Sequence, residues 1–278
     1  MNRMYTRIRS TVVVPPSETM TAALDLLQCP DHRGVLTAAA TELRCSECGP
    51  VACLADEGIF NAVGGSLTPT SRSQRLMQSA CVARIYERWW RPCLVRVVSH
   101  LTYRAEDALV DRYAQAGARR RVLELCCGTA RATRSLVTSA GLGLGIDLSL
   151  PMLREARRRA GASRVILLRG DAQRAFARAN AFDLAICFAA LHLLTNPAAA
   201  LTHATQALRP GGVFVGWALT TSGAFETSPR LARAARRVGL RLFAPGALRG
   251  LVQDSGLTCV ETSTDGAIEL VAAERGDG

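Results

Sequence analysis

The chain has 278 residues, 49% of them hydrophobic, so it can bury a substantial core in one large domain with a small one beside it. No apolar run reaches the roughly 20 residues that span a bilayer, and the stretch Val12–Val14 is too short for a signal peptide. The net charge is +11, and every Lys or Arg position is an arginine. Because these arginines are dispersed over many expected helices, they are weak evidence for binding of nucleic acid. We therefore predict a cytoplasmic protein without a membrane contact.

Residues 1–23 are predicted to be a flexible leader, and residues 24–65 a small metal-binding module. Four of its side chains have metal-ligand chemistry and form two close pairs: Cys29, His32, Cys45 and Cys48. Two such pairs joined by a hairpin have the spacing of a tetrahedral structural Zn²⁺ site with no open position. The alternative is that the same four groups bind no metal, but so small a module needs a cross-link such as a metal ion to be stable. Cys53 is expected to be a bystander.

Residues 66–118 are predicted to be a linker followed by a helical lid segment. The segment contains three clustered aromatic residues: Tyr86, Trp89 and Trp90. They could cover a substrate pocket, with Arg88 and Arg91 as contacts for an anion. The alternative is a helix stripe that faces the core, which we expect for Trp89.

From residue 119 to residue 278, strands and helices alternate in the pattern of a doubly wound sheet. Helix Pro151–Ala160 is expected to begin at the N-cap Ser149. The strands are expected at Val122–Leu125, Gly143–Ile146, Arg164–Leu168, Phe182–Phe188 and, after a turn at 209–212, Val213–Trp217. Thr258–Ser263 and Ala267–Ala272 could pair as an antiparallel edge hairpin. The predicted fold class is α/β, a Rossmann-like doubly wound sheet with an antiparallel edge hairpin, preceded by a zinc ribbon and a helical segment.

The stretch from Val122 to Asp147 predicts one half of a nucleotide site. An apolar strand leads into the small-residue turn Cys126–Ala130, then a helix and a second strand that ends in Asp147. A carboxylate about 20 residues beyond such a turn can accept hydrogen bonds from ribose hydroxyls, while the turn lets backbone approach the ligand.

Four segments in order resemble the class I S-adenosylmethionine-dependent methyltransferases, type 11-like: Val122–Ala130, Gly145–Asp147, Gly170–Ala172 and Leu208–Gly212. The N-terminal module resembles the zinc-ribbon adaptor of methyltransferases in its segments Leu27–Pro30, Leu43–Gly49 and Asp56–Phe60. The resemblance implies S-adenosylmethionine as cofactor, in addition to structural Zn²⁺. It also implies a set of cofactor-binding residues: Glu124, Cys126, Gly128, Asp147, Leu148, Asp171, Ala172 and Phe188.

Each of these residues has an implied role. Glu124 and the backbone of Cys126–Gly128 would surround the methionine portion, and Phe188 would lie near the methyl donor. Asp147 would hold the ribose, with Leu148 against the adenine. The adenine amine would contact Asp171, with Ala172 beside it.

The turn departs from the family at two positions. Cys126 and Ala130 stand where glycines are usual, and glycine serves there for close approach and positive φ. We therefore expect these two side chains to affect the affinity for the cofactor more than the fold. Cys126 and Cys127 are interpreted as packed thiols rather than as nucleophiles.

The predicted function is methylation of a small-molecule acceptor at O, N or C. His192 follows the fourth strand, where a histidine lies over the substrate in many small-molecule methyltransferases; it is a candidate base or only packs. Asn196-Pro197 does not supply a signature for methylation of base amines. The alternatives are an rRNA or tRNA base methyltransferase whose ribbon contacts RNA, and a non-methylating cofactor-binding protein or cyclase. The oligomeric state stays open.

Overall fold

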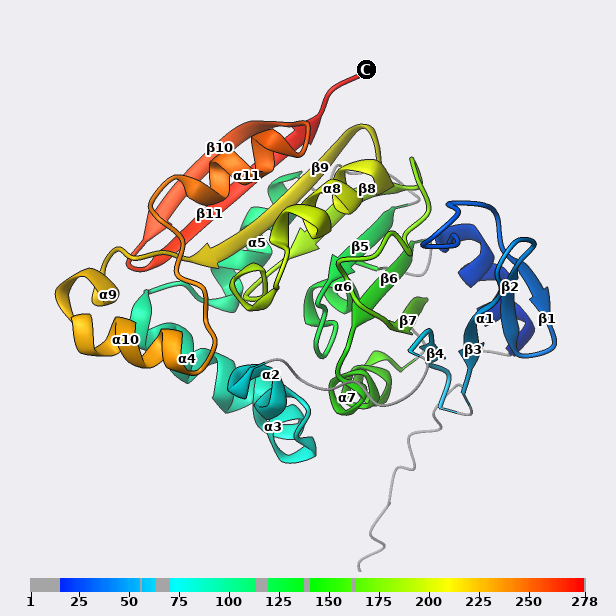
Figure 1. Cartoon of the computed structure of the whole chain (residues 1–278), viewed down its shortest axis with the longest axis horizontal. Coiled ribbons are helices and arrows are strands. Elements are labelled where there is room, and N and C mark those ends of the chain that lie inside the picture. Colours follow the sequence, from blue (N-terminus) through cyan, green and yellow to red (C-terminus); the bar gives the residue numbers. More distant parts are fainter. Residues whose placement is uncertain are drawn as a thin grey trace, which may run out of the picture.

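The computed structural model describes residues 16–55, 57–63, 71–113, 120–137, 141–161 and 164–277. The strands of these residues form one sheet in the order β1-β2-β3-β4-β7-β6-β5-β8-β9-β11-β10 (Figure 1). Their bounds are β1 Thr37–Ala39, β2 Glu42–Cys45, β3 Gly49–Leu54, β4 Phe60–Asn61, β5 Arg121–Leu125, β6 Leu142–Asp147, β7 Val165–Arg169, β8 Phe182–Cys187, β9 Leu208–Leu219, β10 Leu257–Asp265 and β11 Ile268–Arg275. The helices are α1 Pro16–Leu26, α2 Arg72–Met77, α3 Ala80–Ile85, α4 Arg91–Val98, α5 Tyr103–Tyr113, α6 Arg131–Leu136, α7 Leu150–Ala160, α8 Pro197–Ala207, α9 Ala224–Thr227, α10 Pro229–Arg237 and α11 Ala247–Asp254.

The central strands confirm the predicted fold class. Strands β7, β6, β5, β8 and β9 are parallel neighbours, and β11 then pairs antiparallel with both β9 and β10 as the predicted edge hairpin. Ser149 caps α7 as expected, since its hydroxyl accepts the Met152 N–H at 3.3 Å. One boundary differs: residues 209–212 are part of the long strand β9 rather than a turn before it.

Side-chain alternation along the strands builds a core on each face of the sheet. On β5, Leu123 and Leu125 belong to the cluster that also contains Leu201 of α8, whereas Val122 belongs to the cluster that contains Leu153 of α7. The sheet is therefore covered by helices on both faces, which is the layering that buries parallel strands.

The N-terminal module is continuous with the main sheet. Strand β4 pairs parallel with β7, with Phe60 opposite Leu168, so the ribbon strands extend the sheet at one end (Figure 1). Helix α1 begins at Pro16, within the segment expected to be a flexible leader, and its Ala23 and Leu26 are fully buried. The leader prediction is therefore wrong for residues 16–23, because apolar contacts fix this helix against the sheet. Residues 1–15 lie outside the described residues.

The segment between the ribbon and β5 is helical, as predicted, and contains a π-helical turn at Tyr86–Trp90 between α3 and α4. The expectation that Trp89 faces the core is wrong, because its side chain is 59% exposed, with the Arg88 guanidinium 5.7 Å from its ring centroid. The beginning of the predicted linker, residues 66–70, lies outside the described residues. Helices α9 and α10 lie near α4 at one end of the sheet (Figure 1) and were not predicted. No helix among the described residues is long and apolar enough to cross a bilayer.

Candidate active site

The turn between β5 and α6 has a strained backbone. Cys126, Gly128 and Ala130 each have a φ of 52°, in the left-handed region. The positive φ expected where Cys126 and Ala130 replace glycine is therefore present, and each non-glycine residue carries a cost of about 1 kcal/mol there. The turn packs closely on β6, because a Cβ built on Gly145 would lie 2.8 Å from the Cys127 sulfur.

The two cysteines of this turn are poor nucleophiles. The neighbouring Cys187 thiol and burial raise the pKa of Cys126 well above its usual value. Burial, with the nearby charge of Asp147, raises the pKa of Cys127 in the same direction. Since the thiolate is the nucleophilic form, both residues stay as inert thiols, in line with their interpretation as packing residues.

Two carboxylates flank the turn. The Glu124 carboxylate is buried and accepts the Thr133 N–H at 2.9 Å and the Thr133 hydroxyl at 2.6 Å. Asp147 ends β6 and accepts the N–H groups of Gly128 at 2.8 Å and Ser149 at 2.7 Å. Burial raises the pKa of both carboxyls. A carboxylate has about four acceptor positions, so Asp147 keeps capacity for two ligand hydroxyls while it holds the turn.

The residues predicted to contact adenine lie beside Asp147. The N–H of Gly170 donates to the Asp147 carbonyl at 3.1 Å, which brings the loop after β7 next to the end of β6. Asp171 accepts the backbone N–H of Gln173 at 2.9 Å and so is held at the start of this loop. Ala172 is buried and Leu148 is half-buried. The contacts of these residues with a cofactor stay a prediction.

A small cavity of about 30 Å³ lies against the turn. Glu124, Cys126, Gly128 and Phe188, all predicted to bind the cofactor, line it together with Tyr86 and Arg91 of the helical segment. Tyr86 and Arg91 therefore lie beside the residues that are predicted to hold the methionine portion of the cofactor. A mobile lid over the site, expected from the sequence, stays a prediction.

A buried ion-pair network closes the site, and the sequence did not predict it. Arg91 donates to both carboxylate oxygens of Glu106, one at 2.9 Å, and the indole N–H of Trp217 donates to the same carboxylate at 2.7 Å. Arg131 also contacts Glu106, at 3.4 Å. The sequence left open that Arg91 contacts a ligand anion, whereas its charge is balanced by Glu106 inside the protein. The partners come from α4, α5, α6 and β9, and no local spacing signals such a network.

Glu106→Gln is expected to lower the free energy of unfolding by about 3 kcal/mol, because it leaves buried guanidinium charge without its carboxylate. The exposed pair between Glu57 and Arg154 provides a matched control, and Glu57→Gln should cost less than about 1 kcal/mol. Denaturant titration of the two variants checks the difference. Equal losses would show that burial of the Glu106 network does not govern stability.

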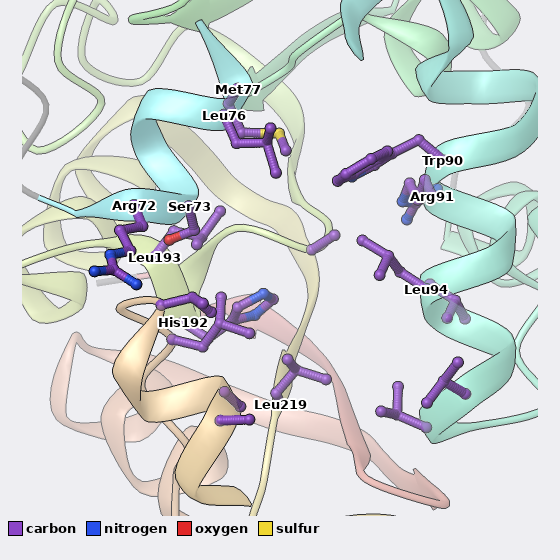
Figure 2. A pocket seen from close by; sticks show the side chains of 18 of the residues that line it. Arg72, Ser73, Leu76, Met77, Trp90, Arg91, Leu94, His192, Leu193 and Leu219 are labelled. Carbon is purple, nitrogen blue, oxygen red and sulfur yellow. The ribbon is translucent and has the colours of Figure 1, made fainter. Parts of the chain in front are cut away.

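A larger cavity of about 440 Å³ adjoins the first one, because Tyr86 and Arg91 line both. Three segments surround it with their side chains: α2, the Trp90–α4 side and the loop after β8. Trp90 points into the space between them (Figure 2). Trp217 lines the cavity as well. The volume lies in the range of small-molecule sites.

His192 lies in the wall of this larger cavity. It sits in the 3₁₀ turn Leu191–Leu193, is only 6% exposed, and stacks on Trp217 with ring centroids 6.0 Å apart. Its Nδ1 is buried and has no hydrogen-bond partner among the described residues. Burial, helped by the charge of Arg91, lowers the pKa of His192 to about 3, so the ring is neutral at physiological pH.

Comparison with known proteins agrees with this geometry. Residues 122–212, which include the turn, Asp147 and Asp171, match a family model described as "Methyltransferase domain". These residues are therefore similar in sequence to methyltransferase domains. The fold is similar to that of solved methyltransferases: phosphoethanolamine N-methyltransferase 2 of Haemonchus contortus superposes with a TM-score of 0.61 at 14% identity, over 76% of this chain and 61% of that one.

Two further similarities delimit the match. The demethylmenaquinone methyltransferase of Lactiplantibacillus plantarum is 38% identical over 101 residues, which cover 34% of this chain and 43% of that protein. The [4+2]-cyclase SpnF superposes with a TM-score of 0.55 at 18% identity, over 77% of this chain and 99% of that one. The chain spans less than half the length of the curated relatives that it matches, 43% and 48%.

The four predicted metal ligands lie together at the far end of the sheet from the edge hairpin. The ligand atoms of Cys29, His32, Cys45 and Cys48 are all within 4.8 Å of one another. The Cys29 sulfur is 3.5 Å from the Cys48 sulfur and 3.6 Å from His32 Nδ1. A tetrahedron with Zn–S bonds of about 2.3 Å has edges of about 3.8 Å, so the four groups fit a zinc ion.

Contacts around the ligands also suit a metal. The Nδ1 of His32 faces the sulfurs, while its Nε2 lies 3.7 Å from a Glu47 oxygen, the orienting contact that metal-bound histidines usually have. The backbone N–H groups of Cys48 and Glu47 lower the pKa of Cys45 to about 6, whereas the neighbouring Cys29 thiol and burial raise the pKa of Cys48 to about 12. A bound cation would favour the thiolate at both cysteines. Cys53 lies outside this group, as expected. Strand β4 connects this module to the parallel part of the sheet through β7.

Proposed function

We propose that the chain is an S-adenosylmethionine-dependent methyltransferase that acts on a small molecule. The observation that carries this proposal is the 440 Å³ cavity, which shares Tyr86 and Arg91 with the space against the turn. A molecule in the larger cavity would therefore lie next to one bound at the turn. The similarity to a relative named for methylation of demethylmenaquinone supports a small acceptor rather than a polynucleotide.

We propose that residues at both ends of the turn bind the cofactor. Asp147 would accept hydrogen bonds from the ribose hydroxyls, with Leu148, Asp171 and Ala172 around the adenine. Glu124, Cys126, Gly128 and Phe188 would surround the methionine portion. When bound, S-adenosylmethionine supplies a methyl group on a positively charged sulfur. The protein then acts mainly by positioning the acceptor and by excluding water.

His192 is proposed to orient the acceptor and to take its proton late in the reaction. A base with a pKa of about 3 cannot ionise a hydroxyl of pKa ~10 in advance, since seven units correspond to about 10 kcal/mol. The neutral ring can still accept a hydrogen bond from the acceptor through Nδ1. As the new bond to the methyl carbon forms and the carbon–sulfur bond breaks, the acceptor becomes acidic and its proton can pass to His192.

One observation favours RNA as an alternative substrate. Helix α10 exposes four arginines, Arg230, Arg233, Arg236 and Arg237, and none has an acidic partner among the described residues. The proposed zinc ribbon could add a second contact. Binding through phosphates would weaken by orders of magnitude between 50 and 200 mM salt.

The test begins with calorimetry of S-adenosylmethionine binding, followed by transfer of labelled methyl to a panel of phenols and amines or to total RNA. We expect label in a small acceptor, with a rate that changes little with salt and is unaffected by the paired change Arg236→Glu and Arg237→Glu. Label in RNA that both salt and this variant abolish would establish the alternative. Cofactor binding without transfer to any acceptor would indicate a non-methylating protein or a cyclase.

A further inference from the structure

The walls of the 440 Å³ cavity are almost entirely apolar. Helices α2, α4 and α10 and strand β9 contribute leucine, valine, methionine and alanine side chains to it, among them Met77, Val95, Leu219 and Ala235. Contact with such walls is favourable for hydrocarbon, at roughly 25 cal/mol for each Å² removed from water. It is costly for a phosphate or an ammonium, which would lose its hydration.

The mouth of the cavity is apolar too. Eight large hydrophobic side chains are exposed on the described surface, and four of them line this cavity: Leu76, Leu94, Val97 and Val238. They belong to three different helices, α2 and α4 and the end of α10, so their gathering comes from tertiary packing rather than from one sequence run. A cluster of exposed apolar side chains around an opening marks a surface that binds apolar matter.

Two arginines line the cavity, Arg72 of α2 and Arg91 of α4, and Arg72 is exposed at the surface. The guanidinium of Arg91 is already balanced by Glu106, so it does not select an anionic acceptor. The buried Nδ1 of His192 and the buried indole N–H of Trp90 have no partner among the described residues. A buried polar atom without a partner costs about 1–3 kcal/mol, which a ligand hydroxyl at His192 would recover.

We propose that the acceptor is lipophilic, with a hydrocarbon or fused-ring body in the cavity and one uncharged hydroxyl that reaches His192. This inference rests on the proposed function, because it takes the occupant of this cavity as the molecule that is methylated. It narrows the acceptor to neutral, poorly water-soluble alcohols or phenols, and it places any polar extension outside the mouth.

Binding of three simple probes tests the proposal: phenol, 4-hexylphenol and hexylbenzene, each displacing the fluorescent apolar dye N-phenyl-1-naphthylamine. We expect 4-hexylphenol to bind at least 100-fold more tightly than phenol, since each buried methylene contributes about 0.8 kcal/mol. Val97→Asp at the mouth should weaken 4-hexylphenol at least about tenfold. Val260→Asp changes an exposed valine on β10, away from the cavity, and should have no effect.

His192→Phe isolates the polar end of the site. The ratio of the affinities for 4-hexylphenol and hexylbenzene should fall about fivefold in this variant, which corresponds to one hydrogen bond. Equal affinity for phenol and 4-hexylphenol, or equal effects of the two valine variants, would overturn the proposal. Cofactor binding with transfer to a charged acceptor would also overturn it, while the proposed function would survive. Tight 4-hexylphenol binding without cofactor binding would refute the proposed function and leave a lipophilic site.

Discussion

Cys48→Ser is expected to release zinc and to lower the melting temperature of the whole protein. Cys48 is exposed, so a cysteine without a metal there could become serine at little cost. As a zinc ligand it cannot, because structural zinc contributes on the order of 10 kcal/mol to the folding of modules of this kind. The proposed ion would hold α1 and the ribbon strands together, and through β4 the edge of β7.

The matched control is Cys53→Ser, which changes another exposed cysteine of the same module that lies outside the ligand group. Metal analysis should give one zinc per chain for the wild type and for Cys53→Ser, and none for Cys48→Ser. Thermal unfolding should show a loss for Cys48→Ser alone. A metal-free wild-type protein that unfolds at the same temperature as its zinc-loaded form would refute the zinc site.

Asp147→Ala is expected to weaken S-adenosylmethionine binding by at least 100-fold. Each hydrogen bond to a charged group contributes about 1.5–3 kcal/mol, and two ribose hydroxyls would lose theirs together. The variant also removes the acceptor for the Gly128 N–H, so the turn loses one of its supports. Asp147→Asn retains one acceptor oxygen and should give an intermediate affinity.

Asp183→Ala serves as the control for this effect. Asp183 also accepts a backbone N–H, from Arg121 at 2.7 Å, but it lies at the start of β8, away from the turn. Both alanine variants should lose a similar amount of stability, and only Asp147→Ala should lose cofactor affinity in calorimetry. Unchanged affinity in Asp147→Ala would remove the ribose assignment without touching the fold.

The parallel sheet was predictable because its signals are local. Strands such as Val122–Leu125 are short apolar runs, helix α7 begins at a capping serine, and each element ends near the residue that the sequence indicates. Three of the four family motifs reach the carboxyl ends of β5, β6 and β7, so Asp147 and Asp171 are brought together by topology alone. The fourth, Leu208–Gly212, lies at the beginning of β9. Positive φ at Cys126 followed from the same pattern.

The incorrect predictions concern residues whose burial or ion pairing depends on segments far away in the sequence. The beginning of α1 was predicted as a leader because a short run of apolar residues does not reveal its partner. Ala23 and Leu26 are buried only because the helix packs against the sheet. Trp89 looked like a core residue because helical spacing does not tell which face of the π-helical turn is covered. Arg91 looked free to bind an anion because Glu106 is fifteen residues away along the chain.

The sequence by itself determined the methyltransferase fold, the ligand spacing of the proposed zinc site and the residues around the turn, since each is encoded in a short run. Only the tertiary structure decided the acceptor side of the site. Its cavity is assembled from α2, α4, α10, β9 and the loop of His192, which no single periodicity links. The burial that keeps His192 neutral depends on all of these elements packing together, and a linear pattern does not record it.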